Sequence, residues 1–326
     1  MKSTTFVIFL ALLDFTVVSA ETILIADKTA DTLLFFDTSA GKVTRSVSVG
    51  GNPHEVAVTP DGRIAFTANS RSNTVSVVDV ASGTERRRLE SPLFAYPHGM
   101  AVHPDGKTLF LTVEQKSLLV AIDVETLEIK GSYPTEMQGS HMVVLSPVGD
   151  VAYLTNRESH SVTKLQMASP NGLQHAPAGN GAEGIALTPD GGLLLAANRN
   201  DNDVMLFDTS SLEPSGRIPV GEAPVRIACS PEGRLALVTH RASHQVHVLD
   251  LGSKAVTARF PVGREPGGVL FSRDGRQAFV ANTGEGTLSV IDMSALKVVS
   301  THDAGEGPDG MVFVPDSPDP TENGNQ

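Results

Sequence analysis

Residues 53–83, PHEVAVTPDGRIAFTANSRSNTVSVVDVASG, decide the fold because close copies of them recur along the chain. Three of these copies are PHGMAVHPDGKTLFLTVEQKSLLVAIDVETL (97–127), AEGIALTPDGGLLLAANRNDNDVMLFDTSSL (182–212) and PGGVLFSRDGRQAFVANTGEGTLSVIDMSAL (266–296). Two more begin at Ser140 and Pro224. The second residue of each leading dipeptide falls at positions 54, 98, 141, 183, 225, 267 and 309, so the period is 44, then 43, and 42 thereafter. A steady period of this length is typical of a repeat architecture.

Each copy contains about four short strands of alternating apolar residues. The first strand runs to a Pro-Asp-Gly turn, in which proline presets φ and glycine permits a positive φ. The second strand ends near TAN or AAN, the third ends at an aspartate such as Asp79 or Asp292, and the fourth leads into the next copy. We expect these aspartates to cap turns through their side chains. Four strands in roughly 40–45 residues is the size of a β-propeller blade.

The two ends of the chain supply complementary parts of one more blade. Residues 308–314, PDGMVFV, contain only a first strand, whereas residues 22–49 contain only a second, third and fourth strand. Joining them closes the ring and removes the open sheet edges that a row of repeats would leave. We therefore predict an all-β protein, a seven-bladed β-propeller with four-stranded blades over residues 21–316. The C-terminal first strand joins the three N-terminal strands.

The second-strand endings TAN, LTN, AAN and VAN, followed by strands like TVSVVD, resemble the YVTN-repeat β-propeller family. The resemblance extends over nearly all of the chain after residue 20. It implies the propeller fold. The seven-bladed relatives include lactonases, the propeller subunits of quinoprotein amine dehydrogenases, and copper enzymes such as nitrous-oxide reductase. A shared fold does not choose among these activities.

The first twenty residues have the pattern of a secretory signal peptide. Lys2 precedes an apolar run at residues 6–13, and small residues lead up to an expected cleavage site after Ala20. The run is too short to span a membrane. We therefore expect an exported protein, periplasmic or extracellular, with no membrane span. Residues 317–326 are rich in Pro, Asp and Asn, and we expect them to form a disordered tail.

Composition limits the classes of partner and chemistry. The net charge of −12 argues against nucleic acid as a partner. Cys229 is the single cysteine, which excludes an internal disulfide, and we expect its thiol to be structural. The chain lacks the G-x-S-x-G, P-loop, dinucleotide-binding, C-x-x-C-H and EF-hand motifs, so a covalent serine or cysteine hydrolase is not supported.

The start of every first strand should ring the mouth of the central channel. Read in blade order, that ring is His54, His98, His141, Glu183, Val225, Gly267 and Asp309. Because the ring closes, Asp309 neighbours His54, and five adjacent blades present Asp, His, His, His and Glu. Neutral imidazoles bind zinc, copper and iron. We predict a transition-metal site at the three histidines, with Glu183 or Asp309 as ligand or general base. The alternative is that each histidine hydrogen-bonds a neighbouring backbone group.

Two other positions of the repeat add charged side chains to this face. Glu55 and Arg226 occupy the repeat position directly after the ring residue, where most copies have glycine. Their charged side chains indicate a role such as orienting a substrate or forming an ion pair. Arg157, Arg199 and Arg241 occupy one rim position on three consecutive blades. Guanidinium groups recognise carboxylate, phosphate and sulfate, so we predict a small anionic ligand. The alternative for each rim arginine is a solvated surface charge.

Three functional hypotheses follow. The first is an exported enzyme with a channel-mouth metal and an anionic substrate held by the arginines. The second is a non-catalytic propeller that binds a ligand or a protein partner on this face, for example as an accessory subunit of a periplasmic redox enzyme. The third, a lactonase-type hydrolase, rests on the family resemblance alone. The histidines of HRASHQVH (240–247) rank below the channel cluster, because that segment should form a hairpin.

Overall fold

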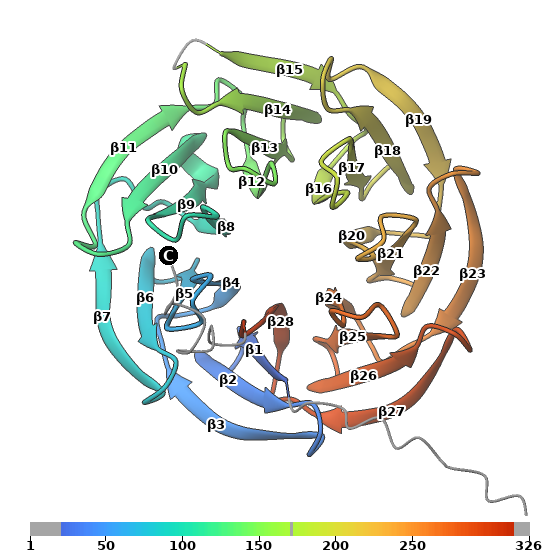
Figure 1. The fold of residues 1–326 in the computed structure, drawn as a ribbon, viewed down its shortest axis with the longest axis horizontal. Coiled ribbons are helices and arrows are strands. Elements are labelled where there is room, and N and C mark those ends of the chain that lie inside the picture. Colours follow the sequence, from blue (N-terminus) through green and yellow to red (C-terminus); the bar gives the residue numbers. More distant parts are fainter. Residues whose placement is uncertain (1–20, 170–171, 316–326) are drawn as a thin grey trace, which may run out of the picture.

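The computed structural model describes residues 21–169 and 172–315. The predicted signal peptide, residues 1–20, and the predicted tail, residues 317–326, lie outside the described residues. Within them the strands form seven antiparallel four-stranded sheets arranged around a central channel (Figure 1). The seven-bladed propeller with four-stranded blades is thereby confirmed.

Each blade runs from the channel outward in four strands (Figure 1). The innermost strands are β28 (Pro308–Phe313), β4 (Pro53–Val58), β8 (Pro97–Val102), β12 (Ser140–Leu145), β16 (Ala182–Leu187), β20 (Pro224–Cys229) and β24 (Pro266–Phe271). The second strands are β1 (Thr22–Asp27), β5 (Ile64–Asn69), β9 (Thr108–Val113), β13 (Val151–Asn156), β17 (Leu193–Asn198), β21 (Leu235–His240) and β25 (Gln277–Asn282).

The outer half of each blade faces solvent along its last strand. The third strands are β2 (Thr32–Asp37), β6 (Thr74–Asp79), β10 (Leu118–Asp123), β14 (Ser161–Gln166), β18 (Asp203–Asp208), β22 (Gln245–Asp250) and β26 (Thr287–Asp292). The fourth strands are β3 (Lys42–Ser48), β7 (Thr84–Glu90), β11 (Ile129–Pro134), β15 (Leu173–Pro177), β19 (Pro214–Pro219), β23 (Ala255–Pro261) and β27 (Lys297–Asp303). A short 3₁₀ helix, η1 (Glu114–Lys116), follows β9.

The ring closes as the two chain ends predict. Strand β28 pairs antiparallel with β1, with Met311 opposite Ile25. The blade order β28-β1-β2-β3 therefore joins the C-terminal first strand to three N-terminal strands. Phe36 and Phe279 are fully buried in the cluster that packs this composite blade against its neighbour. Burial of one such ring contributes about 1.5–3 kcal/mol, so closure is stabilised by packing as well as by strand pairing.

The hydrophobic core lies between neighbouring blades, because strands of alternating residues bury one face against each adjoining sheet. One cluster joins Phe66 of β5 to Leu109 and Leu111 of β9. The turns are polar, as expected: the carboxylate of Asp79 accepts a hydrogen bond from the backbone N–H of Ser82 at 2.7 Å. In the described part of the chain, no helix is long and apolar enough to cross a membrane.

Each innermost strand carries a register irregularity near its start, at the channel mouth. In β4 the pairing with β5 shifts between Pro53 and Glu55, and in β20 it shifts between Pro224 and Arg226. The other five first strands show the same kind of shift. A bulge breaks strict alternation and re-aims side chains. In β20 this allows two consecutive residues, Val225 and Arg226, to line the channel mouth.

Candidate functional site at the channel mouth

The channel mouth brings together nearly all of the residues that the sequence predicts for a site. They surround a cavity of about 110 Å³, which we call the channel-mouth cavity. Its lining consists of Lys28, His54, Tyr96, His98, His141, Arg157, Glu183, Arg199, Val225, Arg226, Arg241, Gly267 and Asp309. Of the predicted residues, Glu55 is the exception: it lies outside this lining and contacts it through an ion pair.

The three histidines stand in a row on β4, β8 and β12. The ring centroids of His54 and His98 are 4.8 Å apart, and those of His98 and His141 are 3.8 Å apart. Both His98 and His141 are 2% exposed. The hydroxyl of Thr112 donates a hydrogen bond to the backbone oxygen of His141 at 2.6 Å, which links β12 to the preceding blade. A Cβ on Gly99 would lie 2.6 Å from that same oxygen, which explains why glycine follows His98.

One end of the histidine row is anchored by Asp309. Its Oδ2 lies 2.9 Å from Lys28 Nζ and 3.2 Å from His54 Nδ1. Burial alone would raise the pKa of this carboxyl, but Lys28 and His54 hold it well below its usual range. Asp309 is therefore an ionised acceptor that fixes two neighbouring side chains.

The other end is anchored by Glu114, which the sequence analysis did not select. Its Oε2 lies 2.7 Å from His141 Nδ1, and its Oε1 lies 3.0 Å from an Arg157 guanidinium nitrogen. Burial opposes ionisation, but the hydrogen bond from His141 and the charge of Arg157 lower the pKa of Glu114. The sequence did contain a signal for Glu114, because it occupies the rim position of the repeat at which three other blades have arginine.

A third ion pair crosses the channel. Arg226 of β20 and Glu55 of β4 come from blades on opposite sides of the ring (Figure 1), and their side chains meet at 2.5 Å. Burial alone would lower the pKa of Arg226, but Glu55 and Asp309 raise it above its ordinary value, so the guanidinium stays protonated. Both side chains are only 11% and 12% exposed. Arg226 therefore forms an ion pair, which is one of the two roles predicted for it, and it also lines the channel-mouth cavity.

The remaining rim arginines are also paired. Arg199 lies 3.1 Å from Glu183, and Arg241 lies 2.7 Å from Glu265. Even so, the cavity lining itself is cationic, because it contains one lysine and four arginines against two carboxylates. The carboxylates of Glu55, Glu114 and Glu265 are not part of the lining, and each pairs with one of its cations.

Several buried nitrogens around the cavity lack a hydrogen-bond partner within the part of the chain described here. They are His98 Nδ1, His141 Nε2 and Arg226 Nε. Burial lowers the pKa of His98 well below its usual range and also lowers that of His141. An unmet buried polar atom costs about 1–3 kcal/mol. All three nitrogens are themselves buried, so they lie in the packing around the cavity and not on its open surface.

Comparison with known proteins gives a family. The YNCE-like beta-propeller model matches residues 14–271, which is well over half of the chain. The chain belongs to the YNCE-like β-propeller family. No curated protein matches it. The propeller part of the predicted resemblance is thereby supported, whereas the YVTN-repeat assignment stays a prediction.

Solved structures confirm the fold of this YNCE-like propeller. A chain of Kuenenia stuttgartiensis hydrazine synthase is 25% identical, with a TM-score of 0.75, covering 85% of this chain and 93% of that one. A functionally unknown protein from Desulfotomaculum acetoxidans DSM 771 has a TM-score of 0.78 at 15% identity, covering 91% of this chain and all of that one. The second likeness shows the fold alone.

The predicted metal ligands of the YNCE-like propeller lie together, but their rings are tilted against one another in a row. Over residues 21–169 and 172–315, no group of three or more His, Cys, Asp or Glu side chains is placed to hold one metal ion. Zinc and similar ions require ligand nitrogens that converge on one point at about 2.0–2.1 Å. Metal binding by His54, His98 and His141 therefore stays a prediction.

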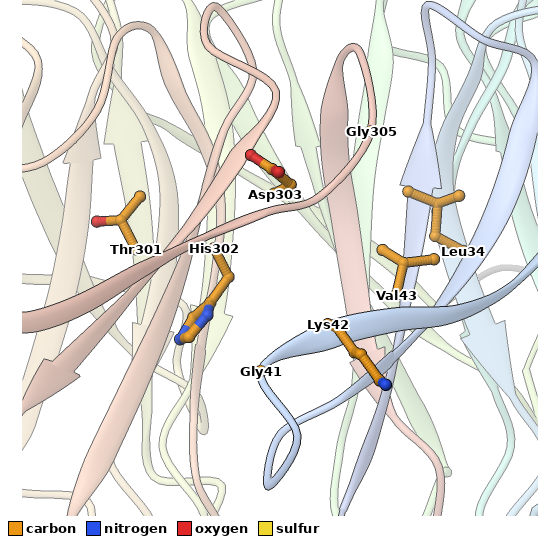
Figure 2. Close-up of a pocket in the computed structure, with 8 residues that line it drawn as sticks. All are labelled: Leu34, Gly41, Lys42, Val43, Thr301, His302, Asp303 and Gly305. Atoms are coloured by element: carbon orange, nitrogen blue, oxygen red, sulfur yellow. The ribbon is translucent and has the colours of Figure 1, made fainter.

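Two other features lie away from the channel. A cavity of about 580 Å³ opens between β3 and β27 of neighbouring blades, and Lys42, His302 and Asp303 are among the residues that line it (Figure 2). The imidazole of His302 is already bound to Ser300 at 2.9 Å. In the HRASHQVH segment, the rings of His240 and His247 lie 3.9 Å apart on β21 and β22, and neither lines the channel-mouth cavity.

Proposed function

We propose that this chain is an exported binding propeller that holds a small anion in the channel-mouth cavity. The observation that carries the proposal is the lining: five cationic side chains face the cavity against two carboxylates. Charge-assisted hydrogen bonds from guanidinium and ammonium groups to oxyanions are about twice as strong as neutral ones. The protein as a whole is acidic, so this cationic lining is a local feature and not a consequence of composition.

The size of the cavity limits the ligand. At about 110 Å³ the cavity accommodates a few waters or an anion of a few heavy atoms. Acetate, glycolate and phosphate are of this size. A nucleotide is far larger, and so is a long-chain lipid.

The ion pairs prepare the cations for binding. Glu55 holds Arg226 from across the channel, and Glu114 and Glu183 hold Arg157 and Arg199. A guanidinium already fixed in place loses less side-chain entropy when it binds a ligand. We assign Arg226 to ligand contact and Glu55 to its positioning. The general-base or ligand roles predicted for Glu183 and Asp309 stay predictions.

The proposal is tested by calorimetric titration of the purified protein with acetate, glycolate, sulfate and phosphate. We expect binding of at least one anion, weakened about tenfold or more by Arg199→Gln, because one charged donor leaves the cavity. Arg86→Gln is the matched control: Arg86 lies on the outer strand β7 and pairs with Asp79, so the same loss of charge should leave affinity unchanged. Equal weakening by both variants would refute a specific site.

A metal centre with zinc, copper or iron is the second candidate. The observation that favours it is that carboxylates face Nδ1 of both His54 and His141, the arrangement by which proteins orient metal-binding imidazoles. Elemental analysis after incubation with each metal, followed by removal of excess, should give about one ion per chain if this is correct. His98→Ala should abolish that ion while the thermal unfolding transition is retained. Wild-type protein that retains no metal rules the candidate out.

Export rests on the sequence pattern of residues 1–20. Its test is fractionation of a host that expresses the full chain, followed by N-terminal sequencing of the product, with Glu21 as the expected first residue. A role as accessory subunit draws on the likeness to a chain of hydrazine synthase. Copurification of a redox enzyme from the native host would favour that role.

A further inference from the structure

Tyr96 is a bulky aromatic residue held in a left-handed backbone conformation at the rim of the channel, with a φ of +59°. The position just before the first strand is left-handed on six blades, where the residues are Asn52, Tyr96, Gly139, Gly181, Ala223 and Glu265. Glycine and asparagine adopt this conformation readily, whereas a bulky side chain makes it unfavourable. The turn itself therefore does not call for tyrosine, and such backbone outliers concentrate at binding sites.

Of these six residues, Tyr96 alone lines the channel-mouth cavity. Its ring centroid lies 6.3 Å from that of His54 and 6.4 Å from that of His98, and its plane is inclined by only 18° to the His98 ring. Its backbone is held from two blades, because its N–H donates to Asn73 Oδ1 at 2.9 Å and its carbonyl accepts from the N–H of Glu114 at 3.1 Å. The ring is thus fixed at the edge of the cavity.

The hydroxyl of Tyr96 is accessible to a ligand. It has no hydrogen-bond partner within the part of the chain that the structure describes, and it is not one of the buried unpaired atoms there, so it is open to solvent. Burial raises the pKa of Tyr96 and Glu114 adds to this effect, so the phenol keeps its proton near neutral pH. The charges of Arg157, Asp309 and Glu183, on three other blades, also act on it. A hydroxyl that experiences charges from so many blades lies on the channel side of the rim.

We propose that Tyr96 is a ligand-contacting residue of the channel-mouth cavity, and that its hydroxyl donates a hydrogen bond to an oxygen of the bound anion. This inference rests on the proposed function and narrows the ligand to an oxyanion. Hydrogen bonds from hydroxyl and guanidinium groups to charged oxygens are short and strong, and several oxygens allow donors on different blades to converge on one ligand. A carboxylate and a tetrahedral oxyanion share this chemistry.

Tyr96→Phe tests the proposal by calorimetric titration with acetate, glycolate, sulfate and phosphate. The variant keeps the ring and the backbone and removes only the hydroxyl. We expect affinity for the carboxylates or for the tetrahedral anions to fall about tenfold or more, and the pair that is affected identifies the source. Tyr133→Phe is the matched control, since Tyr133 is also half-buried but lies on the outer strand β11.

Two outcomes separate this inference from the proposed function. Wild-type affinities in Tyr96→Phe would overturn the contact by Tyr96 and leave anion binding intact. A wild-type protein that binds none of the four anions would overturn both.

Tyr96→Asn distinguishes a ligand contact from a structural role. Asn52 occupies the same left-handed position on the neighbouring blade, so we expect the variant to retain the wild-type midpoint of urea unfolding and to lose affinity. A lowered midpoint with wild-type affinity would show that Tyr96 serves the fold and would overturn the inference.

The contact also has a spectroscopic signature. The chain has three tyrosines and no tryptophan, so its near-ultraviolet difference spectrum reports on tyrosine without interference. A saturating anion should perturb the tyrosine bands of the wild type and of Tyr133→Phe, but not those of Tyr96→Phe. Absence of any perturbation in the saturated wild type would overturn the inference.

Discussion

The ion pair between Arg226 and Glu55 gives the strongest prediction about stability. Replacing Arg226 by methionine leaves the Glu55 carboxylate buried beside Asp309 without its cation. Breaking a buried pair in this way costs about 3–5 kcal/mol. The control is Arg241→Met, which breaks the pair with Glu265; those side chains are 32% and 49% exposed, and such a pair is worth about 1 kcal/mol or less. Urea denaturation measures both free energies of unfolding.

The pH dependence of the Arg226→Met variant has a defined sign. Burial already raises the pKa of Glu55 in the wild type, and loss of Arg226 removes a charge that lowers it. A carboxyl whose folded pKa exceeds its unfolded pKa stabilises the fold most below the unfolded value. This stabilisation is lost as pH rises through the folded value, at up to about 1.4 kcal/mol per pH unit. The variant should therefore be less destabilised, relative to wild type, at pH 5 than at pH 8.

A second substitution completes this test. In Arg226→Met/Glu55→Gln no buried carboxylate is left unpaired at that site, so we expect recovery of much of the lost stability and of the wild-type pH dependence. The reasoning is refuted if Arg226→Met costs no more than Arg241→Met, or if its destabilisation is independent of pH.

Three further predictions concern the same region and the core. Burial holds the pKa of His98 and His141 below the unfolded value, so the free energy of unfolding should fall as pH drops below about 6.5, at up to about 1.4 kcal/mol per pH unit for each ring, and His98→Asn should reduce that slope in urea titrations. Gly99→Ala places a Cβ 2.6 Å from a backbone oxygen and should cost about 1–3 kcal/mol in thermal unfolding, whereas Gly131→Ala, with no atom nearer than 3.9 Å, should cost under about 1 kcal/mol. Burial raises the pKa of Cys229 to about 12, so a thiol reagent at pH 8 should label it rapidly only after denaturation; rapid labelling of the native protein would contradict this.

The fold could be predicted because each repeat carries its own turn chemistry. Asp61 in the first Pro-Asp-Gly turn accepts from the backbone N–H of Arg63 at 3.0 Å, and Gly62 has a φ of +71°, as the turn requires. The composite blade followed from counting strands at the two ends. Both can be read from the sequence alone.

The candidate site was predicted in part, because reading the repeats in register brings together residues far apart in the chain. The column containing His54, His98 and His141 was found in this way, and it lines one cavity. The bulge at the start of each first strand was not foreseen, and it is the reason that Arg226 also reaches the channel.

The partners of these residues could not be predicted. The pairing of Glu55 with Arg226 depends on the width of the channel, and that of Glu114 with His141 depends on the turn that η1 makes after β9. Neither distance is encoded in the repeat pattern. Such pairs between blades decide how the charged side chains around the cavity are held.

The most direct test of the central claim is a crystal structure of the wild-type protein with glycolate. We predict density for one glycolate in the channel-mouth cavity, with its carboxylate within hydrogen-bond distance of Arg226. A cavity that contains only water, at glycolate concentrations that saturate binding in solution, would contradict the claim that the channel mouth is the anion site.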